Sequence, residues 1–202
     1  MVVAFTGYRP EKMPFQESKK DKRYLAFRAI LSRVISRLIE LGGTYCISGV
    51  ARGFDTWVAE ELLELRKENK EIQLECAIPF PGQADSWEKA DQKRRYEILT
   101  ATNEAVITSE HYNRGCFFTR NRYMVDKADV VVCAFNGKSG GTAYTVDYAL
   151  KQNKIVIQID PETSEVPQFI QRTEDDRKRP APVMRKESGN VFKEQKVRSF
   201  NA

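Results

Sequence analysis

The sequence predicts an α/β protein with a Rossmann-like, doubly wound and mostly parallel sheet that carries helices on both faces. Short β-branched and apolar runs alternate with longer segments whose apolar residues recur at helical spacing. Several of the short runs end in glycine-rich or arginine-containing turns. At 202 residues, the chain is long enough to build one such domain around a sizeable core.

Six strands are predicted from runs rich in Val, Ile, Cys and Phe. They cover residues 2–6, 44–48, 73–78, 104–108, 130–135 and 155–159. The run that begins at Val130 is apolar throughout, as in a strand that is covered on both faces. It indicates a parallel sheet.

Five helices are predicted between these strands. They cover residues 21–41, 54–68, 84–102, 117–127 and 142–152. In the first, Leu31, Ile35 and Leu38 lie on one face, and the pair Gly42-Gly43 ends the helix. After Pro161 the periodicity fades.

The charge is concentrated at the end of the chain. The net charge is +5, and residues 172–202 hold nine basic and five acidic residues, so the preceding part is nearly neutral. We therefore expect a domain over residues 1–170 and a basic, mobile tail over residues 171–202. A nearly neutral domain argues against nucleic acid as a partner.

Composition also limits compartment and cofactors. No apolar run reaches the roughly 18 residues of a membrane span, and the short apolar N-terminus lacks a basic leader, which predicts a cytoplasmic protein. Cys46, Cys76, Cys116 and Cys133 are scattered and are expected to be small buried hydrophobes. His111 is the single histidine, so we expect no metal site and no tightly bound cofactor.

The candidate ligand site follows the strands, because ligands of open parallel sheets bind outside the carboxyl ends of the strands. Glycine, arginine and other polar residues gather there, and together they predict a nucleotide-binding crevice. The candidate ligand-binding residues are Gly7, Arg9, Ser48, Gly49, Arg52, Gly53, Asp55, Pro79, Gln83, Arg120, Asn121, Gly140, Gly141 and Thr142. Tyr8, Phe80 or Trp87 could stack on a base.

The turn at Gly140-Gly141-Thr142 is the most informative of these segments. It joins a predicted buried strand to a predicted helix, and glycine lets the backbone and the free N–H groups of the helix start approach an anion. Taken alone, the same residues would equally fit an ordinary strand-to-helix turn.

Two charged residues allow two readings each. Arg120 shares a helix face with Met124, so it either points toward the crevice or belongs to an exposed basic helix start. Asp55 follows Gly53 near a helix N-terminus, where we favour capping of free N–H groups over catalysis.

The motifs as a set resemble the YpsA-like family of the SMF/DprA–LOG (SLOG) superfamily of Rossmann-like domains. The likeness covers roughly residues 1–160 and rests on the segments 6–10, 48–57, 79–83, 120–126 and 140–142 in matching order. It implies a site for nucleotides or nucleotide-derived ligands. LOG-type relatives cleave N-glycosidic bonds of nucleoside monophosphates, DprA-type relatives bind single-stranded DNA, and other members sense ADP-ribose-type signals in bacterial stress and antiviral systems.

The chain departs from the LOG pattern at one position. Arg120 and Met124 match that pattern, but Thr145 stands where its catalytic glutamate would be. Threonine cannot stabilise the cation-like ribosyl centre that forms when a glycosidic bond opens. Asp147 faces elsewhere on the helix, which leaves Asp55 and Glu60, with Arg120, as weak catalytic candidates.

The sequence therefore favours binding, as a sensor or a sequestering protein, of a nucleotide-derived ligand such as an ADP-ribose-type molecule. The alternatives are a LOG-like nucleotide N-glycosidase and, with less support, DprA-like binding of single-stranded DNA. By analogy with LOG-like relatives, a homodimer or higher oligomer is plausible.

Overall fold

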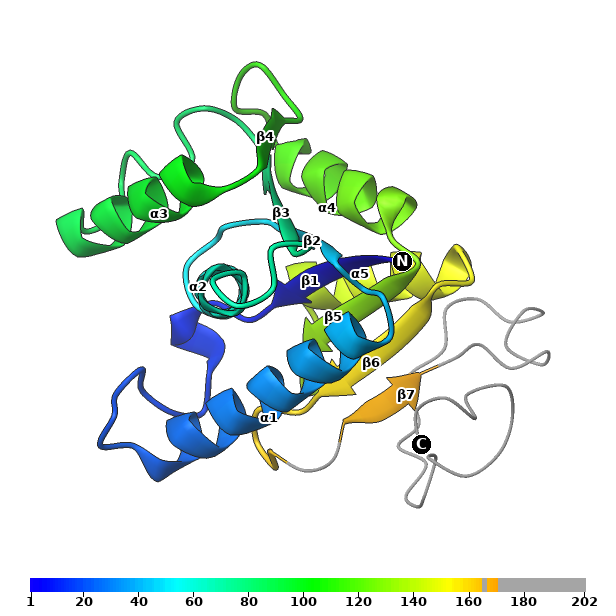
Figure 1. The fold of residues 1–202 in the computed structure, drawn as a ribbon. Helices are drawn as coiled ribbons and strands as arrows, with labels where there is room; N and C mark the ends of the chain where they lie inside the picture. The colour runs from blue at the N-terminus through cyan, green and yellow to red at the C-terminus, as the bar shows by residue number, and fades with distance from the viewer. Residues whose placement is uncertain (165–166, 171–202) are drawn as a thin grey trace.

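The computed structural model describes residues 1–164 and 167–170, and it confirms the predicted fold (Figure 1). One seven-stranded sheet has the order β4-β3-β2-β1-β5-β6-β7, and every neighbouring pair is parallel except β6 and β7. Its strands are β1 (Val2–Gly7), β2 (Tyr45–Ser48), β3 (Gln73–Ile78), β4 (Glu104–Ile107), β5 (Val130–Ala134), β6 (Ile155–Ile159) and β7 (Gln168–Ile170).

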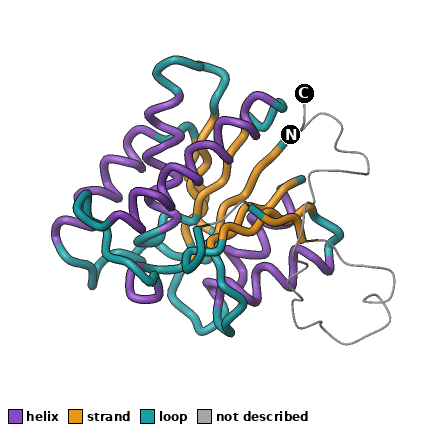
Figure 2. Tube along the Cα trace, turned by 90° about the horizontal axis from the view of Figure 1, so that it is seen from below, coloured by secondary structure: helices purple, strands orange, loops and turns teal. Residues whose placement is uncertain are grey.

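Helices cover both faces of the sheet (Figures 1 and 2). They are α1 (Lys22–Glu40), α2 (Phe54–Leu65), α3 (Lys89–Ala101), α4 (Cys116–Lys127) and α5 (Gly141–Lys151), with a 3₁₀ turn η1 at Pro10–Lys12. The chain runs outward from β1 to β4 and then returns to β5 on the other side of β1. Right-handed crossovers then place α1, α2 and α3 on one face and α4 and α5 on the other, where the two pack together.

The elements differ from the sequence prediction chiefly in two places. The helix expected from residue 84 begins only at Lys89, because residues 82–87 form turns in which Asp85 and Trp87 donate N–H groups to Gly82 and Ala84. The short antiparallel strand β7 was not predicted, since three residues carry too little periodicity. The tail predicted over residues 171–202 lies outside the described residues.

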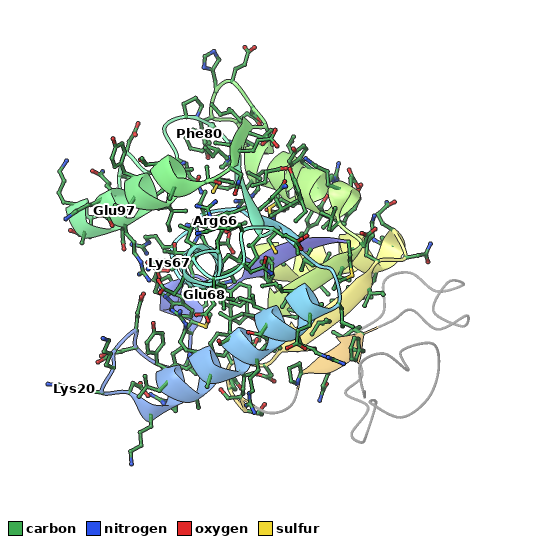
Figure 3. All side chains as sticks on the ribbon, viewed as in Figure 1. Lys20, Arg66, Lys67, Glu68, Phe80 and Glu97 are labelled. Atoms are coloured by element: carbon green, nitrogen blue, oxygen red, sulfur yellow. The ribbon has the colours of Figure 1, made fainter. Side chains whose placement is uncertain are left out.

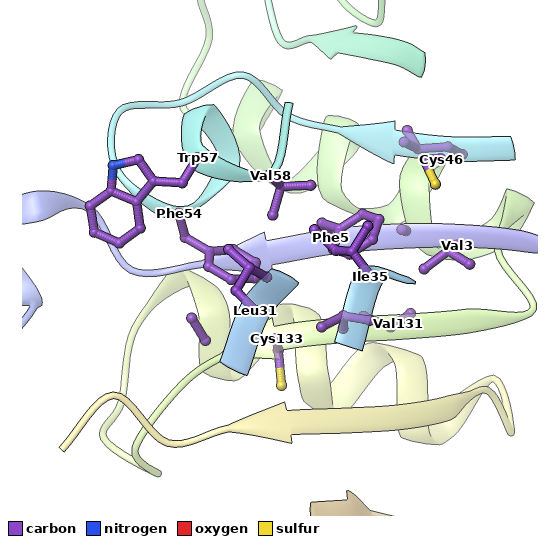
Figure 4. Close-up of a cluster of buried hydrophobic side chains, with 14 of the residues drawn as sticks. Val3, Phe5, Leu31, Ile35, Cys46, Phe54, Trp57, Val58, Val131 and Cys133 are labelled. Carbon is purple, nitrogen blue, oxygen red and sulfur yellow. The ribbon is translucent and has the colours of Figure 1, made fainter. Parts of the chain in front are cut away.

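The core lies between the sheet and its helices (Figure 4). Phe5 of β1 and Val131 of β5 are fully buried, and Leu31 and Ile35 of α1 cover this face of the sheet. A group of packed aromatic rings around Trp57 of α2 extends the core to the β1–α1 segment: Phe15, Tyr24, Phe27 and Phe54.

The strand order reverses between β1 and β5, which makes their carboxyl ends the switch point of the sheet. Tyr8 and Asn136 meet there: the Tyr8 hydroxyl donates to the Asn136 side-chain oxygen and accepts from the Asn136 N–H at 3.4 Å. The turns after these two strands are therefore held together. Within the described residues, no helix has the length and apolar character needed to cross a membrane.

Candidate functional site

A buried ion pair lies at the carboxyl edge of the sheet. The Arg120 guanidinium of α4 lies 4.0 Å from the Asp55 carboxylate of α2, and both side chains are more than nine-tenths buried. The same guanidinium donates to the carbonyl of Gly49 at 2.5 Å and approaches that of Ala77 at 3.4 Å. Arg120 thus points inward, as one of the two readings expected, and bridges helices from opposite faces.

Gly49 makes room for this pair. A Cβ atom built on Gly49 would lie 1.9 Å from Arg120 Nη1 and 2.7 Å from Asp55 Oδ2. Any side chain at this position would displace the guanidinium. The predicted ligand glycine is therefore required by the internal ion pair.

A hydrogen-bond chain runs from Arg120 to the first turn of α5. Arg120 Nε donates to the Asn121 amide oxygen at 2.8 Å, and the Asn121 amide nitrogen donates to the Thr145 hydroxyl at 2.7 Å. Thr145 in turn donates to the carbonyl of Gly141 at 2.9 Å. Asn121 and Thr145 are thereby used inside the protein.

Burial dominates the electrostatics of the pair. It raises the pKa of Asp55 to about 6, and the nearby Arg120 only partly offsets this rise. Burial also lowers the pKa of Arg120 below its ordinary value, an effect that Asp55 opposes and that Arg9 and Arg95 reinforce. Asp55 is therefore largely ionised at neutral pH, beside more than one positive charge.

Asp55 braces loops and does not cap α2. The N-cap of α2 is Gly53, and no side chain caps it. The Asp55 carboxylate instead accepts from the Ala51 N–H at 3.4 Å, while its backbone carbonyl accepts from the Ser48 hydroxyl at 2.8 Å. These contacts fit a structural role for Asp55, but the predicted capping of α2 by its side chain is wrong.

Two other predicted glycines serve chain packing. A Cβ on Gly7 would lie 2.4 Å from the Phe54 ring. Gly53 has φ +85°, and a Cβ there would lie 2.9 Å from the Tyr8 carbonyl oxygen. Both positions let the turn after β1 pass close to the start of α2.

The turn before α5 is more open. Gly140 adopts φ +149°, and a Cβ there would lie 2.8 Å from the Lys12 ammonium, whereas nothing lies within 4 Å of a Cβ on Gly141. Among the hydrogen bonds of the described residues, none uses the N–H groups of Gly141, Thr142 or Ala143. Free N–H groups, the helix dipole and the Lys12 ammonium make this turn attractive to an anion.

The two predicted loop arginines differ. Arg52 is neutralised by Glu11 and by Asp91, the latter at 3.6 Å. Arg9 is exposed and lies over the Phe117 ring at 5.8 Å, and the ion pairs of the described residues do not include it. Of these two, only Arg9 has charge left for a ligand.

The predicted aromatic and polar residues after β3 form a second group. Pro79 is buried, and Phe80, labelled in Figure 3, packs edge-on against Phe117 and Tyr112. Gln83 is 6% exposed, and its side-chain oxygen accepts from Arg95 of α3 at 3.4 Å. Arg95 also lies over the Trp87 ring at 5.9 Å.

The remaining carboxylate candidates do not join Arg120. Glu60 forms a two-oxygen ion pair with Arg94, and Asp147 pairs with Lys151 at 2.6 Å. No metal-binding group of three His, Cys, Asp or Glu side chains occurs in the described part of the chain. Asp55 is the carboxylate that the structure places beside Arg120.

Comparison with known proteins agrees with this architecture. A family profile described as the YspA SLOG family matches residues 3–162. The chain belongs to this family.

Curated members similar to this chain are UPF0398 proteins. One from Halalkalibacterium halodurans is 24% identical over 157 residues, which span 76% of this chain and 82% of that protein. One from Bacillus cereus is 27% identical over 159 residues, 76% of this chain and 85% of that protein. The SLOG part thus accounts for most of these relatives.

The SLOG fold also aligns with two solved structures of DNA processing protein A (DprA). The Streptococcus pneumoniae protein aligns with TM-score 0.51 and 19% identity over 78% of this chain and 50% of that one. The Helicobacter pylori protein, described with its single-stranded DNA binding mode, aligns with TM-score 0.52 and 20% identity over 79% of this chain and 65% of that one. The chain spans only half to two thirds of these proteins, and the likeness is one of fold.

Three positions at this edge of the SLOG domain went unnoticed in the sequence. They are Lys12, Thr145 as a hydrogen-bond bridge, and Arg95. Lys12 and Arg95 each lie in a segment with several charges, where no pattern marks the side chain that turns toward the sheet edge. Only the tertiary contacts single them out.

Proposed function

We propose that this SLOG protein binds a nucleotide-type anion, such as an ADP-ribose-type molecule, at the carboxyl ends of β1 and β5. One observation carries the proposal: the Lys12 ammonium, which has no ionic partner among the described residues, lies at the open start of α5 beside the switch point. The Lys12 ammonium lies at Gly140, and Arg9 stands on the neighbouring turn. An anionic ligand would supply the missing partner.

The phosphate would lie at the start of α5. The N–H groups of residues 141–143 have no acceptor among the described residues, and Gly141 has open space above it. Lys12 would act as a point charge and Arg9 as a planar fork of donors. The partly buried aromatic rings of Phe80 and Phe117 stand near Arg9 and could carry a base.

The residues near the start of α5 favour binding of a ligand without its cleavage. The Thr145 hydroxyl, at the position that would carry a catalytic glutamate in LOG-like relatives, already donates to Gly141 and accepts from Asn121. It is buried and neutral, so it offers no charge to a ribosyl cation. A sensor or a sequestering protein therefore fits this site better than a hydrolase.

One observation favours the enzyme alternative. Asp55 carries a raised pKa beside Arg120, and perturbed carboxylates are common in catalytic sites. However, Asp55 is more than nine-tenths buried and is held by Ala51 and Arg120. It would need to become exposed before it could touch a ribosyl centre.

The test uses the full chain and three variants. Lys12→Gln removes the ammonium at the start of α5, and Gly141→Val adds a side chain where a Cβ would meet no atom within 4 Å. Lys20→Gln is the matched control, because Lys20 lies in the same β1–α1 segment but at its outer end (Figure 3). Each protein is equilibrated with AMP, NAD and ADP-ribose, and the bound material is identified by mass spectrometry.

We expect an intact ligand that Lys12→Gln weakens roughly tenfold, that Gly141→Val abolishes, and that Lys20→Gln leaves unchanged. Equal affinity in all four proteins would refute the site. Recovery of free base with a ribose phosphate, lost in Asp55→Asn, would instead establish the glycosidase. Binding of single-stranded DNA with a steep salt dependence would favour the DprA-like alternative.

A further inference from the structure

Arg95 of α3 is a cation with unfilled hydrogen-bonding capacity at the same edge of the sheet. Among the described residues, its buried Nε has no partner, and its side chain donates one hydrogen bond, to the Gln83 side-chain oxygen at a long 3.4 Å. Gln83 is itself buried, and its amide nitrogen also lacks an acceptor. Within the described residues, the buried Gln83 side chain and the partly buried Arg95 side chain therefore each present a buried donor that lacks an acceptor.

The arrangement of Gln83 is not a matter of amide orientation. Exchanging its oxygen and nitrogen would place the amide donor against the Arg95 donor, which is unfavourable. The loop is also held in place, since Gln92 of α3 donates to the carbonyls of Ala84 and Asp85 at 3.0 and 3.1 Å. The pair of unfilled donors is thus built into the junction of this loop with α3.

Neighbouring cations on α3 show what Arg95 lacks. Arg94 is held by Glu60 and by Glu17, the latter at 2.7 Å, and Lys93 pairs with Glu97 at 3.8 Å. No carboxylate of the described residues lies within ion-pair range of Arg95. Burial lowers the pKa of Arg95, and the Asp85 carboxylate offsets this only from a distance.

A buried donor without an acceptor is unfavourable, and more so when it belongs to a charged group. The positive charges of Arg9 and Arg95 both lower the pKa of Arg120, so the three guanidinium groups share one region. Asp55 is the carboxylate that opposes this effect. What is missing is an acceptor with negative charge, and a guanidinium beside an amide donor matches phosphate oxygens. The Trp87 ring lies beside the group, with its centroid 5.9 Å from the Arg95 guanidinium.

This group is separate from the start of α5. Arg95 lies beside β3, where its charge acts to lower the pKa of Cys76, whereas α5 follows β5. Three strand spacings separate β3 from β5 in the sheet, on the order of 14 Å. One phosphoryl group cannot reach both places, but a ligand that extends along the sheet edge past Arg9 can.

We propose that Arg95 and Gln83 form a second phosphate subsite, so that the ligand is a nucleotide-type molecule with phosphoryl groups at two separate positions. The proposal depends on the proposed function only for the first subsite, at the start of α5. The second subsite itself is a property of Arg95 and Gln83. A nucleotide with one phosphate would fill half of the site.

The test compares Arg95→Gln with Lys93→Gln in the full chain. Both remove one positive charge from α3, but Lys93 is exposed and paired with Glu97. Stabilisation of each protein by inorganic phosphate is measured first, by thermal unfolding. Affinities for AMP, with one phosphate, and for the dinucleotide pApA, with two separated phosphates, are then measured by titration calorimetry.

We expect phosphate to stabilise the wild type and Lys93→Gln equally, and Arg95→Gln less. Arg95→Gln should weaken pApA roughly tenfold to a hundredfold and leave AMP within about twofold. Equal phosphate stabilisation of both variants would overturn the subsite, as would an equal loss of AMP and pApA. A phosphate effect that depends on Arg95, with no nucleotide bound by the wild type, would uphold the subsite while the proposed function fails.

Discussion

Replacing Gly49 by alanine should disrupt the buried ion pair without touching either charged residue. The added Cβ would lie 1.9 Å from Arg120 Nη1, 2.5 Å from its Cζ and 2.7 Å from Asp55 Oδ2. The guanidinium must then move away and lose its bond to the Gly49 carbonyl. Asp55 would be left buried with its partner displaced.

The expected cost follows from breaking a buried pair. Leaving one partner uncompensated costs about 3 to 5 kcal/mol, a large part of the roughly 5 to 15 kcal/mol that stabilises a typical domain. For a chain of this size, this corresponds to a lower Tm by roughly 6 to 20 °C. Urea unfolding followed by circular dichroism measures the free energy, and a thermal scan measures Tm.

A double-mutant cycle separates the clash from a general effect of alanine in the loop. In an Arg120→Met background, two of the three close contacts disappear, and only Asp55 Oδ2 remains near the new Cβ. Gly49→Ala should therefore cost much less there than in the wild type. If its cost were the same in both backgrounds, the glycine would not be required by Arg120, and the reasoning would be wrong.

Two further predictions concern buried carboxylates. Lys127→Met should lower the free energy of unfolding, measured by urea titration, by about 2 kcal/mol, because Lys127 donates at 2.6 Å to the fully buried Glu75. As a control, Lys151→Met removes the partner of the surface residue Asp147 and should cost less than about 1 kcal/mol. Asp55→Asn should change the pH dependence of stability. Burial raises the pKa of Asp55 from 3.8 to about 6, so the carboxyl group binds its proton more tightly in the folded protein than in the unfolded chain. The contribution of Asp55 to stability therefore falls as the pH rises from about 4 to about 6. The difference in unfolding free energy between wild type and Asp55→Asn should therefore shift by at most about 3 kcal/mol between pH 4 and pH 7, and a constant difference would contradict the raised pKa.

The sheet could be predicted from the sequence because each of its longer strands has a local sequence pattern. The apolar run of β5 and the glycines that follow the strands are sequence patterns with a direct structural meaning. The antiparallel β7 could not be predicted because three residues carry too little periodicity, and the late start of α3 could not be predicted because side-chain hydrogen bonds hold the turn before it. Gln92, for example, holds the turn before α3 through the carbonyls of Ala84 and Asp85.

The structure brings Arg120 and Asp55 together at the strand ends, as the sequence prediction placed them, but the sequence could not assign the candidate residues to ligand or to scaffold. Glycine, arginine and asparagine suit a phosphate, and they equally suit tight turns and buried carbonyls. In the structure, Gly49 makes room for the buried ion pair, and the partly buried Asn121 amide is hydrogen-bonded to Arg120 and Thr145. Whether a ligand contacts the remaining candidates stays a prediction.

The property that separates ligand contacts from scaffold is whether each donor already has an acceptor. Arg52, Arg94 and Arg120 are paired inside the domain. Arg9, Lys12 and Arg95 have no carboxylate within ion-pair range among the described residues. Removing charge from the paired arginines should therefore cost stability, because it leaves a carboxylate alone, with the largest loss at the fully buried Arg120.

Removing charge from Arg9 or Lys12 should cost affinity and leave the unfolding free energy nearly unchanged, whereas removing it from Arg95 should cost affinity and also relieve a buried donor that has no acceptor. The two groups lie along the same edge and share residue types, so composition cannot explain a difference between them. A clear separation of the two effects would mean that the edge was organised around an anion that the protein itself does not supply.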